Sequence, residues 1–418
     1  MKRFFCLLLT ALMILTLFGC QKEPKATEPA PTEAPELVVE VDPARKYEDA
    51  ELVFWSDWED NTPEARVLTQ AAEYFEGTTG AQVEIRWLDT GRAGLSDALA
   101  GGEKIDIFHI PGAQLSVYKA YAADLTELAG DTAYQQGLTT RIVNRSGGQL
   151  LALPYVPSFE GVYYNAEAFE ACGIESVPTT WEDFLDVCHR LEAGGYEPLA
   201  LDSSAAVRVF EFHLDSRFAS AYWDQLKTVD GWRNCDEAIQ AVQEIIDFAS
   251  AGYLVKGSPS EFPAGQNKLA ISNAAMVLGN TELCRQVEET TLTEVSWGMF
   301  SWPGSQIAYD AEVLVMNADT GNTQAAFAFI KLLTTGEFDQ LRADVTGGIP
   351  ADTANQSPIA GAAEAAAAAD VAIPGRLPAG EGITELIGKL WKGEIRDAKD
   401  FAKSMDGFYA EYDLQSVG

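Results

Sequence analysis

The stretch LVFWSDWEDNTPEARVLTQAAEYFEGTTGAQVEIRW, residues 52–87, decides the fold class of this chain. Its first four residues, 52–55, are apolar and rich in strand-forming types, which is typical of a buried strand. Thr62-Pro63 then predicts the start of a helix, because proline is well tolerated at the first helical position. Apolar residues recur at helical spacing up to Gly80, and residues 83–87 then alternate with the period of a strand. A strand, a helix and a strand in succession predict an α/β fold.

The same alternation continues along the chain. Residues 180–183, Thr-Trp-Glu-Asp, read as a helix start of the capping-box kind, and Gly194-Gly195 ends that helix. From about Glu51 the chain has about 370 residues, more than one ordinary core accommodates, so two domains are expected. Further strands are expected at 105–109, 150–154, 161–164, 270–278, 295–300 and 311–316, and further helices at 239–249, 323–333 (ending at Gly336), 360–369 and 383–412.

The N-terminus has the pattern of an export signal. Lys2 and Arg3 precede residues 4–18, which are apolar apart from two threonines. That run is shorter than the roughly 20 apolar residues of an ordinary membrane-spanning helix, which favours a secretory signal. It ends in Leu17-Phe18-Gly19-Cys20, which resembles the bacterial lipobox. We therefore expect a lipoprotein signal peptide over 1–19 and lipid on Cys20, with a plain signal peptide or an uncleaved anchor as the alternatives.

Residues 20–50 are expected to form the lipidated cysteine and a flexible linker. A segment rich in proline, threonine, alanine and glutamate buries little apolar surface and stays extended. Such a spacer suits a folded body held at a membrane surface. Its prolines are Pro24, Pro29, Pro31 and Pro35.

The charge and the cysteines limit the function further. The formal net charge is −34, and loss of Lys2 and Arg3 with the signal would make it about −36. Such a surface repels nucleic acid and anionic lipid headgroups. Beyond Cys6 in the signal and Cys20, four cysteines remain without zinc-site spacing, and export permits disulfides, so three connectivities or buried free thiols stay open. They are Cys172, Cys188, Cys235 and Cys284.

No catalytic or cofactor motif stands out. The chain has no nucleophile elbow, Walker loop, H-E-x-x-H or G-x-G-x-x-G pattern. His109, His189 and His213 are scattered without the spacing of metal ligands. We expect no enzyme activity, no cofactor and no metal, although a pair of hydrolytic carboxylates is invisible in a sequence with so many acidic residues.

Aromatic residues beside short polar ones follow several of the expected strands. In open α/β sheets, ligands bind beyond the carboxyl ends of strands. Sugars suit such places, because their C–H faces pack on aromatic rings and their hydroxyls bond to polar side chains. These stretches are 55–60, 155–160, 279–282 and 302–304.

The order of these segments resembles the extracellular solute-binding proteins of the maltose-binding type, receptors of carbohydrate ABC importers. The resemblance covers about Glu51 to Glu411, and its closest single match is Pro178-Thr-Thr-Trp-Glu-Asp-Phe184. In two places the chain departs from the family pattern: many members carry a tryptophan after the glycine at 279, where this chain has Asn280-Thr281, and the loop at Gly91-Arg92 is poorly matched. The other matching motifs are Thr79-Gly80-x-x-Val83, Lys104-Ile-Asp-Ile107, Leu153-Pro-Tyr155 with Val162-Tyr-Tyr-Asn165, Glu197-Pro-Leu-Ala200, Phe262 to Met276, and Gly348-Ile-Pro350.

The resemblance implies a two-lobed periplasmic-binding-protein-like α/β fold, each lobe a sheet flanked by helices. It implies a first lobe of 51–160 and 308–350 and a second lobe of 161–307 and 351–418. The chain would cross between the lobes near 160–163 and 306–310. Ligand contacts on both lobes would stabilise closure by a hinge motion, and the closed form would be recognised by the permease.

The resemblance and the aromatic loops together predict the ligand site and the partners. We expect a monomer that captures a sugar or oligosaccharide for ABC permease subunits, lipid-anchored on the extracytoplasmic face of the cell membrane. A polyamine, a metal complex or another small solute on the same fold is the alternative, followed by a surface glycosidase and a surface adhesion protein. The predicted ligand-binding residues are Trp55, Asp57, Trp58, Glu59, Arg92, Gly112, Tyr155, Phe159, Glu160, Trp223, Asn280, Trp302 and Asp310.

Overall fold

A computed structural model gives the structure of the chain. The chain divides into two compact units, Met1–Val38 and Val39–Gly418, and every described residue belongs to the second. The predicted signal peptide, Cys20, the prolines of the linker, Arg92, Cys284 and most of the helix expected at 360–369 lie outside the described residues. The structure describes residues 46–88, 94–130, 138, 145–146, 148–201, 203–217, 221–255, 274–281, 295–305, 308–362, 377 and 380–416.

The strand, helix and strand expected within residues 52–87 are present. They are β1 (Glu51–Trp55), α2 (Pro63–Thr79) and β2 (Gln82–Arg86). The Thr62 side chain caps α2 by accepting from the backbone N–H of Ala65 at 3.1 Å. At the other end, Gly80 adopts the left-handed conformation, with φ of 81°, that commonly terminates helices. The local signals in this stretch therefore predict its structure correctly.

The sheet mixes parallel and antiparallel strands, and α-helices accompany it, so the predicted α/β class is confirmed. Its strand order is β2-β1-β3-β10-β6-β8-β7, with β9 paired to β6. β1 is parallel to β2 and β3, and β7 is parallel to β8, whereas β10 and β6 run antiparallel to their neighbours. The strands not yet given are β3 (Ile107–Pro111), β6 (Leu153–Asn165), β7 (Glu197–Leu201), β8 (Ala274–Gly279), β9 (Trp297–Phe300) and β10 (Ala308–Met316), and a separate hairpin holds β4 (Arg145–Ser146) and β5 (Gln149–Leu150).

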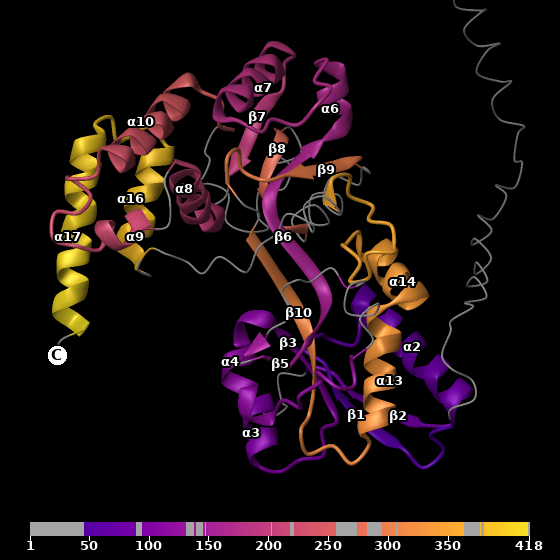
Figure 1. Ribbon diagram of the computed structural model, residues 1–418. Helices are drawn as coiled ribbons and strands as arrows, with labels where there is room; N and C mark the ends of the chain where they lie inside the picture. The colour runs from indigo at the N-terminus through magenta and orange to yellow at the C-terminus, as the bar shows by residue number, and fades with distance from the viewer. Residues whose placement is uncertain are drawn as a thin grey trace, which may run out of the picture. The chain divides into compact units, whose positions relative to one another are not determined.

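The long strand β6 changes partners in its middle (Figure 1). Its first part, up to Glu160, pairs with β10, and its second part, from Gly161, pairs with β8 and β9. Gly161 is required at this point, because a Cβ there would lie 2.9 Å from the carbonyl oxygen of Phe300. One strand is thus shared by two groups of strands.

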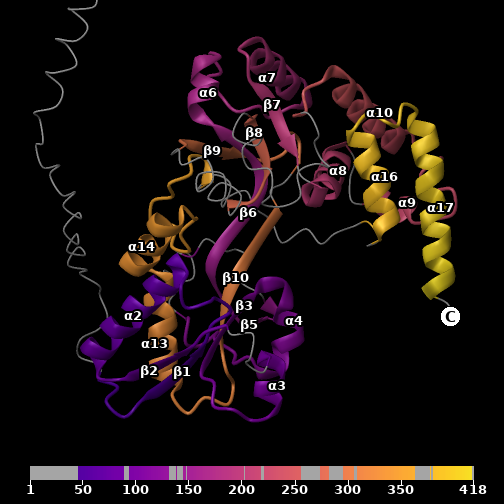
Figure 2. The same cartoon turned by 180° about the vertical axis from the view of Figure 1, so that it is seen from behind.

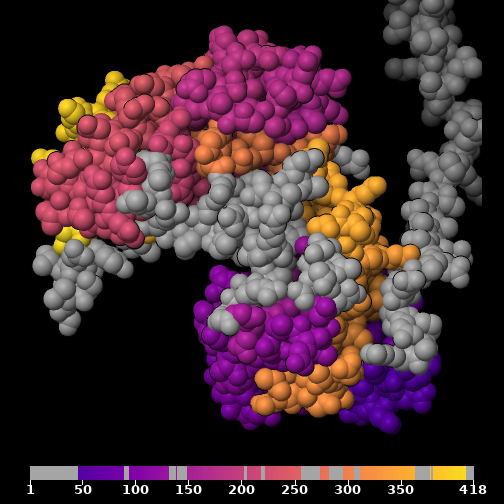
Figure 3. Space-filling view, in the orientation of Figure 1, coloured from indigo at the N-terminus to yellow at the C-terminus, as the bar shows by residue number. Residues whose placement is uncertain are grey.

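Helices bury two separate clusters of apolar side chains against these strands. The larger cluster includes α7, α8, α10, α16 and α17, and α10, α16 and α17 pack side by side (Figures 1 and 2). The space-filling view shows α6, α7 and α10 merging into one surface (Figure 3). The second cluster includes Trp55, Phe108 and Val315. The helices are α3 (Leu95–Ala100), α4 (Leu115–Tyr118), α6 (Ala166–Ala171), α7 (Trp181–Ala193), α8 (Ser203–Arg217), α9 (Ala221–Leu226), α10 (Asp236–Ala251), α13 (Thr323–Thr334), α14 (Gly336–Thr346), α16 (Glu381–Trp391) and α17 (Ala398–Ser416), with short 3-10 turns η1 (Gly112–Gln114) and η2 (Lys119–Tyr121).

The structure corrects the expected role of Gly336 and decides between the alternatives for three of the cysteines. Gly336 was expected only to end a helix, but it is the first residue of α14, with φ of 62°. Of the options for the cysteines, the free thiol holds for Cys172, Cys188 and Cys235, so Cys172 and Cys188 are not bridged. Among the described residues, no helix has both the length and the apolar character needed to cross a bilayer.

Candidate functional site

A pocket of about 470 Å³ opens where several elements end. The loop after β1 and the first turn of α2 form one part of it, and the last residue of β3 lies beside them. The residues after β8, the middle of β6 and β10, and the C-terminal end of α14 form the rest. Its lining residues are Trp58, Thr62, Glu64, Pro111, Val156, Ser158, Glu160, Asn280, Thr281, Ala311, Glu312, Thr346 and Gly348.

The side chains of β6 alternate between two faces of the strand, and one of these faces lines the pocket. Val156, Ser158 and Glu160 line the pocket, and they lie two residues apart, as side chains on one face of a strand do. Phe159 belongs to the opposite face and is fully buried. The polar face of β6 therefore turns toward the pocket and its aromatic face toward the core.

Trp58 and Glu312 form one wall of the pocket, and a hydrogen bond joins their side chains. Oε2 of Glu312 accepts from the indole Nε1 of Trp58 at 3.1 Å and lies 2.9 Å from Nε2 of the buried His109. Since an ionised carboxylate only accepts hydrogen bonds, Nε2 of His109 is the donor. The Trp58 ring also packs on the rings of His109 and Tyr155, with centroids 4.4 and 5.3 Å away. The indole is thus held in place by three side chains.

An irregularity in the sheet lies at this wall. The β6–β10 register shifts between Glu312 and Val313, which pair with Val156 and Pro154, so Tyr155 is an extra residue. Such bulges redirect side chains and are frequent beside functional sites. Tyr155 is 1% exposed, and burial raises the pKa of its hydroxyl well above the usual range. The bulge therefore places a neutral tyrosine behind Trp58.

The carboxyl group of Glu312 is held in its ionised form. Burial alone would raise its pKa, but hydrogen bonds from His109 and Trp58 and the positive charge of Arg342 bring the pKa below its ordinary value. The side chain keeps 39% of its surface exposed, so it remains accessible from the pocket. Glu312 is therefore an anionic hydrogen-bond acceptor that a solute in the pocket can reach.

Glu160 lies where β6 changes partners and is tied to a helix. Its Oε2 accepts from Nε of Arg208 on α8 at 2.6 Å. The guanidinium of Arg208 also reaches Glu211, at 3.3 Å. One arginine is thus shared by two carboxylates and offsets only part of their charge, and no cationic side chain lines the described part of the pocket.

The predicted ligand-binding residues divide between the pocket and the interior. Trp58, Glu160 and Asn280 line the pocket. Asp57, Glu59 and Gly112 do not line it, but each is next in sequence to a lining residue. Gly112 follows the lining residue Pro111, while Asp57 and Glu59 are exposed on either side of Trp58. Arg92 and the side chain of Asp310 lie outside the described residues, although the Asp310 backbone pairs with Ser158.

Five predicted aromatic residues are buried instead. Trp223 donates to Asp215 at 2.6 Å, and Trp302 packs against Trp181, Phe184 and Trp391. A ring packed on all sides has no free face for a solute, so these rings are not brought into the pocket. The five are Trp55, Tyr155, Phe159, Trp223 and Trp302, each at most 3% exposed.

Several lining residues were not predicted from the sequence. Glu312 is the most informative, because a single carboxylate inside the apolar run 311–316 is an unusual choice for a strand and was a usable signal. Thr62 and Glu64 belong to a helix start that was predicted, but their orientation toward a pocket was not. Thr346 is the last residue of α14 and Gly348 lies just beyond it, and the sequence did not indicate that helix.

The described residues contain no cluster of three or more His, Cys, Asp or Glu side chains suited to a metal ion. The pocket instead combines one aromatic ring, three carboxylates, one amide and four hydroxyl groups. This is a set of hydrogen-bonding groups around a stacking surface.

A family comparison assigns most of this chain. Residues 59–337 match the model described as bacterial extracellular solute-binding protein. No curated protein matches the chain by sequence.

Solved structures agree in fold. RafE of Streptococcus pneumoniae in its apo-form has a TM-score of 0.65 at 16% identity, covering 86% of this chain and 97% of that one. The putative binding protein MsmE of Bacillus subtilis, in an open conformation, has a TM-score of 0.64 at 17% identity, covering 90% and 100%. The GacH receptor of Streptomyces glaucescens, described unliganded and with acarbose, has a TM-score of 0.58 at 17% identity, covering 87% and 98%. The two-lobed solute-binding fold expected from the sequence is thereby confirmed.

Proposed function

Because the chain belongs to the bacterial extracellular solute-binding proteins, we propose that it captures a sugar or oligosaccharide in the pocket at Trp58 and Glu312. The protein then delivers this solute to the permease of an ABC importer, and it binds the solute without chemical turnover. The structural relatives support the carbohydrate class, since they include RafE in complex with raffinose, GacH in complex with acarbose and a chitin oligosaccharide binding protein.

One observation carries the proposal: an oriented indole and an ionised carboxylate share one wall of the pocket. The ring offers a flat apolar surface to the C–H face of a sugar. Glu312 accepts a hydrogen bond from a sugar hydroxyl, and a bond to a charged group is stronger than one between neutral groups. Asn280 and the hydroxyls of Ser158 and Thr281 supply further directional contacts from the other elements.

The sequence-derived lobes fit this mode of capture. We propose a first lobe of 51–160 and 308–350 and a second lobe of 161–307 and 351–418, which meet where β6 changes partners. A solute that contacts both lobes favours the closed form by its differential affinity for that form. Cys20 would carry the lipid that holds the receptor, as a monomer, on the extracytoplasmic face of the membrane.

A thermal-shift screen of the purified full-length chain tests the solute class. Raffinose, acarbose, chitin oligosaccharides and xylo-oligosaccharides form the carbohydrate panel, and spermidine and putrescine form the cationic panel. A ligand at about 100 times its Kd stabilises the folded state by about 2.7 kcal/mol, which raises Tm by several degrees.

Two variants make the screen specific to the pocket. Trp58→Ala should remove the shift caused by an active sugar, while Glu73→Gln, an exposed position on α2 outside the pocket, should retain it. A shift that survives Trp58→Ala would place binding elsewhere. Release of any product from an active oligosaccharide would refute binding without turnover.

A cationic solute such as a polyamine is the second candidate. It is favoured by the charged residues that line the pocket within the described ranges, which are all carboxylates: Glu64, Glu160 and Glu312. A Tm increase with spermidine and none with the sugars would replace the carbohydrate proposal with this one.

Lipid attachment is tested separately. Metabolic labelling with palmitate should mark the wild-type chain and leave Cys20→Ser unlabelled. Labelling of Cys20→Ser would contradict the proposed anchor.

A further inference from the structure

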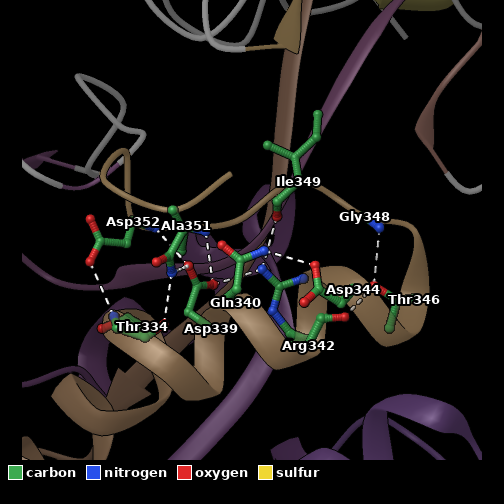
Figure 4. A network of polar contacts seen from close by, with 12 residues as sticks. Thr334, Asp339, Gln340, Arg342, Asp344, Thr346, Gly348, Ile349, Ala351 and Asp352 are labelled. Atoms are coloured by element: carbon green, nitrogen blue, oxygen red, sulfur yellow. Dashed lines mark hydrogen bonds and ion pairs between the residues drawn. The ribbon is translucent and has the colours of Figure 1, made fainter. Parts of the chain in front are cut away.

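A buried ion pair on α14 lies directly behind the pocket. Asp339 and Arg342 are both fully buried, and Nη2 of Arg342 donates to Oδ1 of Asp339 at 2.8 Å (Figure 4). The same nitrogen donates to the carbonyl oxygen of Ile349 at 2.8 Å, and the Asp339 oxygens accept from the backbone N–H groups of Ala351 and Asp352 at 2.9 Å. The pair therefore clamps the segment that follows α14.

That segment begins with two residues of the pocket wall. Thr346 donates its hydroxyl to the carbonyl oxygen of Arg342 at 2.8 Å and accepts from the N–H of Gly348 at 3.2 Å. A Cβ at Gly348 would lie 2.8 Å from Oγ1 of Thr346 and 3.6 Å from Nη1 of Arg342, so only glycine fits this close approach. The Thr346 hydroxyl thus bonds to the main chain of Arg342, and the Arg342 side chain holds the same segment at the carbonyl oxygen of Ile349, one residue beyond Gly348.

The opposite side of Arg342 faces the other wall. Its guanidinium carbon lies 5.7 Å from the centre of the Tyr155 ring, and Tyr155 packs on Trp58. Nε and Nη1 of Arg342 and the hydroxyl of Tyr155 have no hydrogen-bond partner within the described part of the chain. The positive charge of Arg342 also acts on Glu312 and helps to lower its pKa.

Stability alone is a poor explanation for this arrangement. Desolvating two charges is costly, and well-packed apolar residues in place of a buried ion pair are often neutral or stabilising. Here the charged pair reaches the Ile349 carbonyl beyond one wall and the Tyr155 ring behind the other wall, and apolar side chains would not reproduce these electrostatic contacts.

We propose that Arg342, held by Asp339, is a positioning residue that fixes the Thr346–Gly348 wall and, through Tyr155, orients the Trp58–Glu312 wall. The inference rests on the proposed function in taking this pocket as the solute site. Arg342 does not itself line the pocket, so it acts through these neighbours.

The first test measures the ionisation of Glu312 beside Trp58, and it needs no ligand. The full-length chain is labelled with 5-fluorotryptophan, and the Trp58 ¹⁹F resonance is assigned by its loss in Trp58→Phe. Its acid titration reports the Glu312 carboxylate, which is faced by His109 from β3, Trp58 from the loop after β1, Tyr155 from β6 and Arg342 from α14. Glu312→Gln should abolish that titration.

Two substitutions that each remove one charge of the pair should move the midpoint in opposite directions. Arg342→Met removes a positive charge and leaves Asp339 unbalanced, so the midpoint rises. Asp339→Asn leaves the Arg342 charge unbalanced, so the midpoint falls. A purely structural role would lower Tm in both variants without this opposition in sign.

Amide hydrogen exchange measures how firmly the Thr346–Gly348 wall is held. Arg342→Lys retains the charge but not the planar fork, so the midpoint should stay near the wild-type value while amides in 346–352 exchange several-fold faster. Asp406→Asn is the matched control, because Asp406 also accepts from two backbone N–H groups and one arginine, and neither it nor these partners line the pocket. It should change neither readout.

Three outcomes overturn the proposal. They are an unchanged midpoint in Arg342→Met, a midpoint that shifts the same way in Asp339→Asn, and unchanged exchange of 346–352 in Arg342→Lys. If Arg342→Met does not fold, Asp339→Asn and Arg342→Lys still decide between the outcomes. Failure of every sugar in the thermal-shift screen leaves these measurements readable, so the two proposals fail separately.

Discussion

Replacing Glu312 with glutamine should destabilise the protein at neutral pH and much less in acid. The carboxylate accepts from Nε1 of Trp58 at 3.1 Å and from Nε2 of His109 at 2.9 Å. Hydrogen bonds to charged groups contribute about 1.5–3 kcal/mol, against about 0.5–1.5 kcal/mol for neutral ones. With 39% of the Glu312 side chain exposed, solvent screening reduces the difference, and we expect a loss of about 1 kcal/mol.

The pH dependence follows from the direction of the pKa shift. The pKa of Glu312 is lower in the folded protein than its ordinary value, so its stabilisation is present above the unfolded pKa. It is lost as the pH falls through the folded pKa. Wild type and Glu312→Gln should therefore differ most near pH 7 and converge toward pH 3.

Thermal unfolding of both proteins across this pH range measures the effect. A loss of about 1 kcal/mol corresponds to about 1–3 °C in Tm for a body of this size. Glu59→Gln is the control, since Glu59 is exposed and lies one residue from Trp58. A Tm difference between wild type and Glu312→Gln that stays constant from pH 7 to pH 3 would refute the reasoning.

The remaining predictions concern packing and selectivity. Gly161→Ala should lower the free energy of unfolding by about 1–3 kcal/mol, seen in urea titration, because its Cβ would meet the Phe300 carbonyl oxygen at 2.9 Å. Trp302→Ala should cost about 3–5 kcal/mol by leaving a cavity, while calorimetry on any folded fraction should show the solute affinity unchanged. An oligosaccharide of uronic acids should give no thermal shift, since carboxylates at Glu64 and Glu312 repel its charge; a Tm increase with it would contradict the assigned pocket.

Local sequence signals predicted the fold where they are strong. Thr62 and Thr180 were expected to begin helices, and both cap them, with side chains accepting from Ala65 and Asp183. The helix α14 escaped prediction because Thr335-Gly336 has the composition of a terminator, whereas Gly336 opens the next helix in a left-handed conformation. Short-range patterns cannot distinguish these two uses of a glycine.

The site was only partly accessible from sequence. Trp58 and Asn280 reach the pocket just after the ends of β1 and β8, where the α/β rule places ligands, whereas Glu160 reaches it from the middle of β6. Phe159 does not reach the pocket. The face that a strand residue presents depends on the register of the strand, and the register of β6 depends on β10, which lies far along the chain. Glu312 and Arg342 act on one another across elements, which no local pattern records.

The late position of β10 has a consequence for the order of folding. β10 is the strand that joins β3 to β6, yet it is synthesised only after α6 to α10 and β7 to β9. Until it arrives, β3 has one unpaired edge and the first half of β6 has no partner in the sheet. Long-range pairings form slowly, since the loop between the partners must close first. A nascent chain of this topology should thus stay without its central strand until most of it has been made.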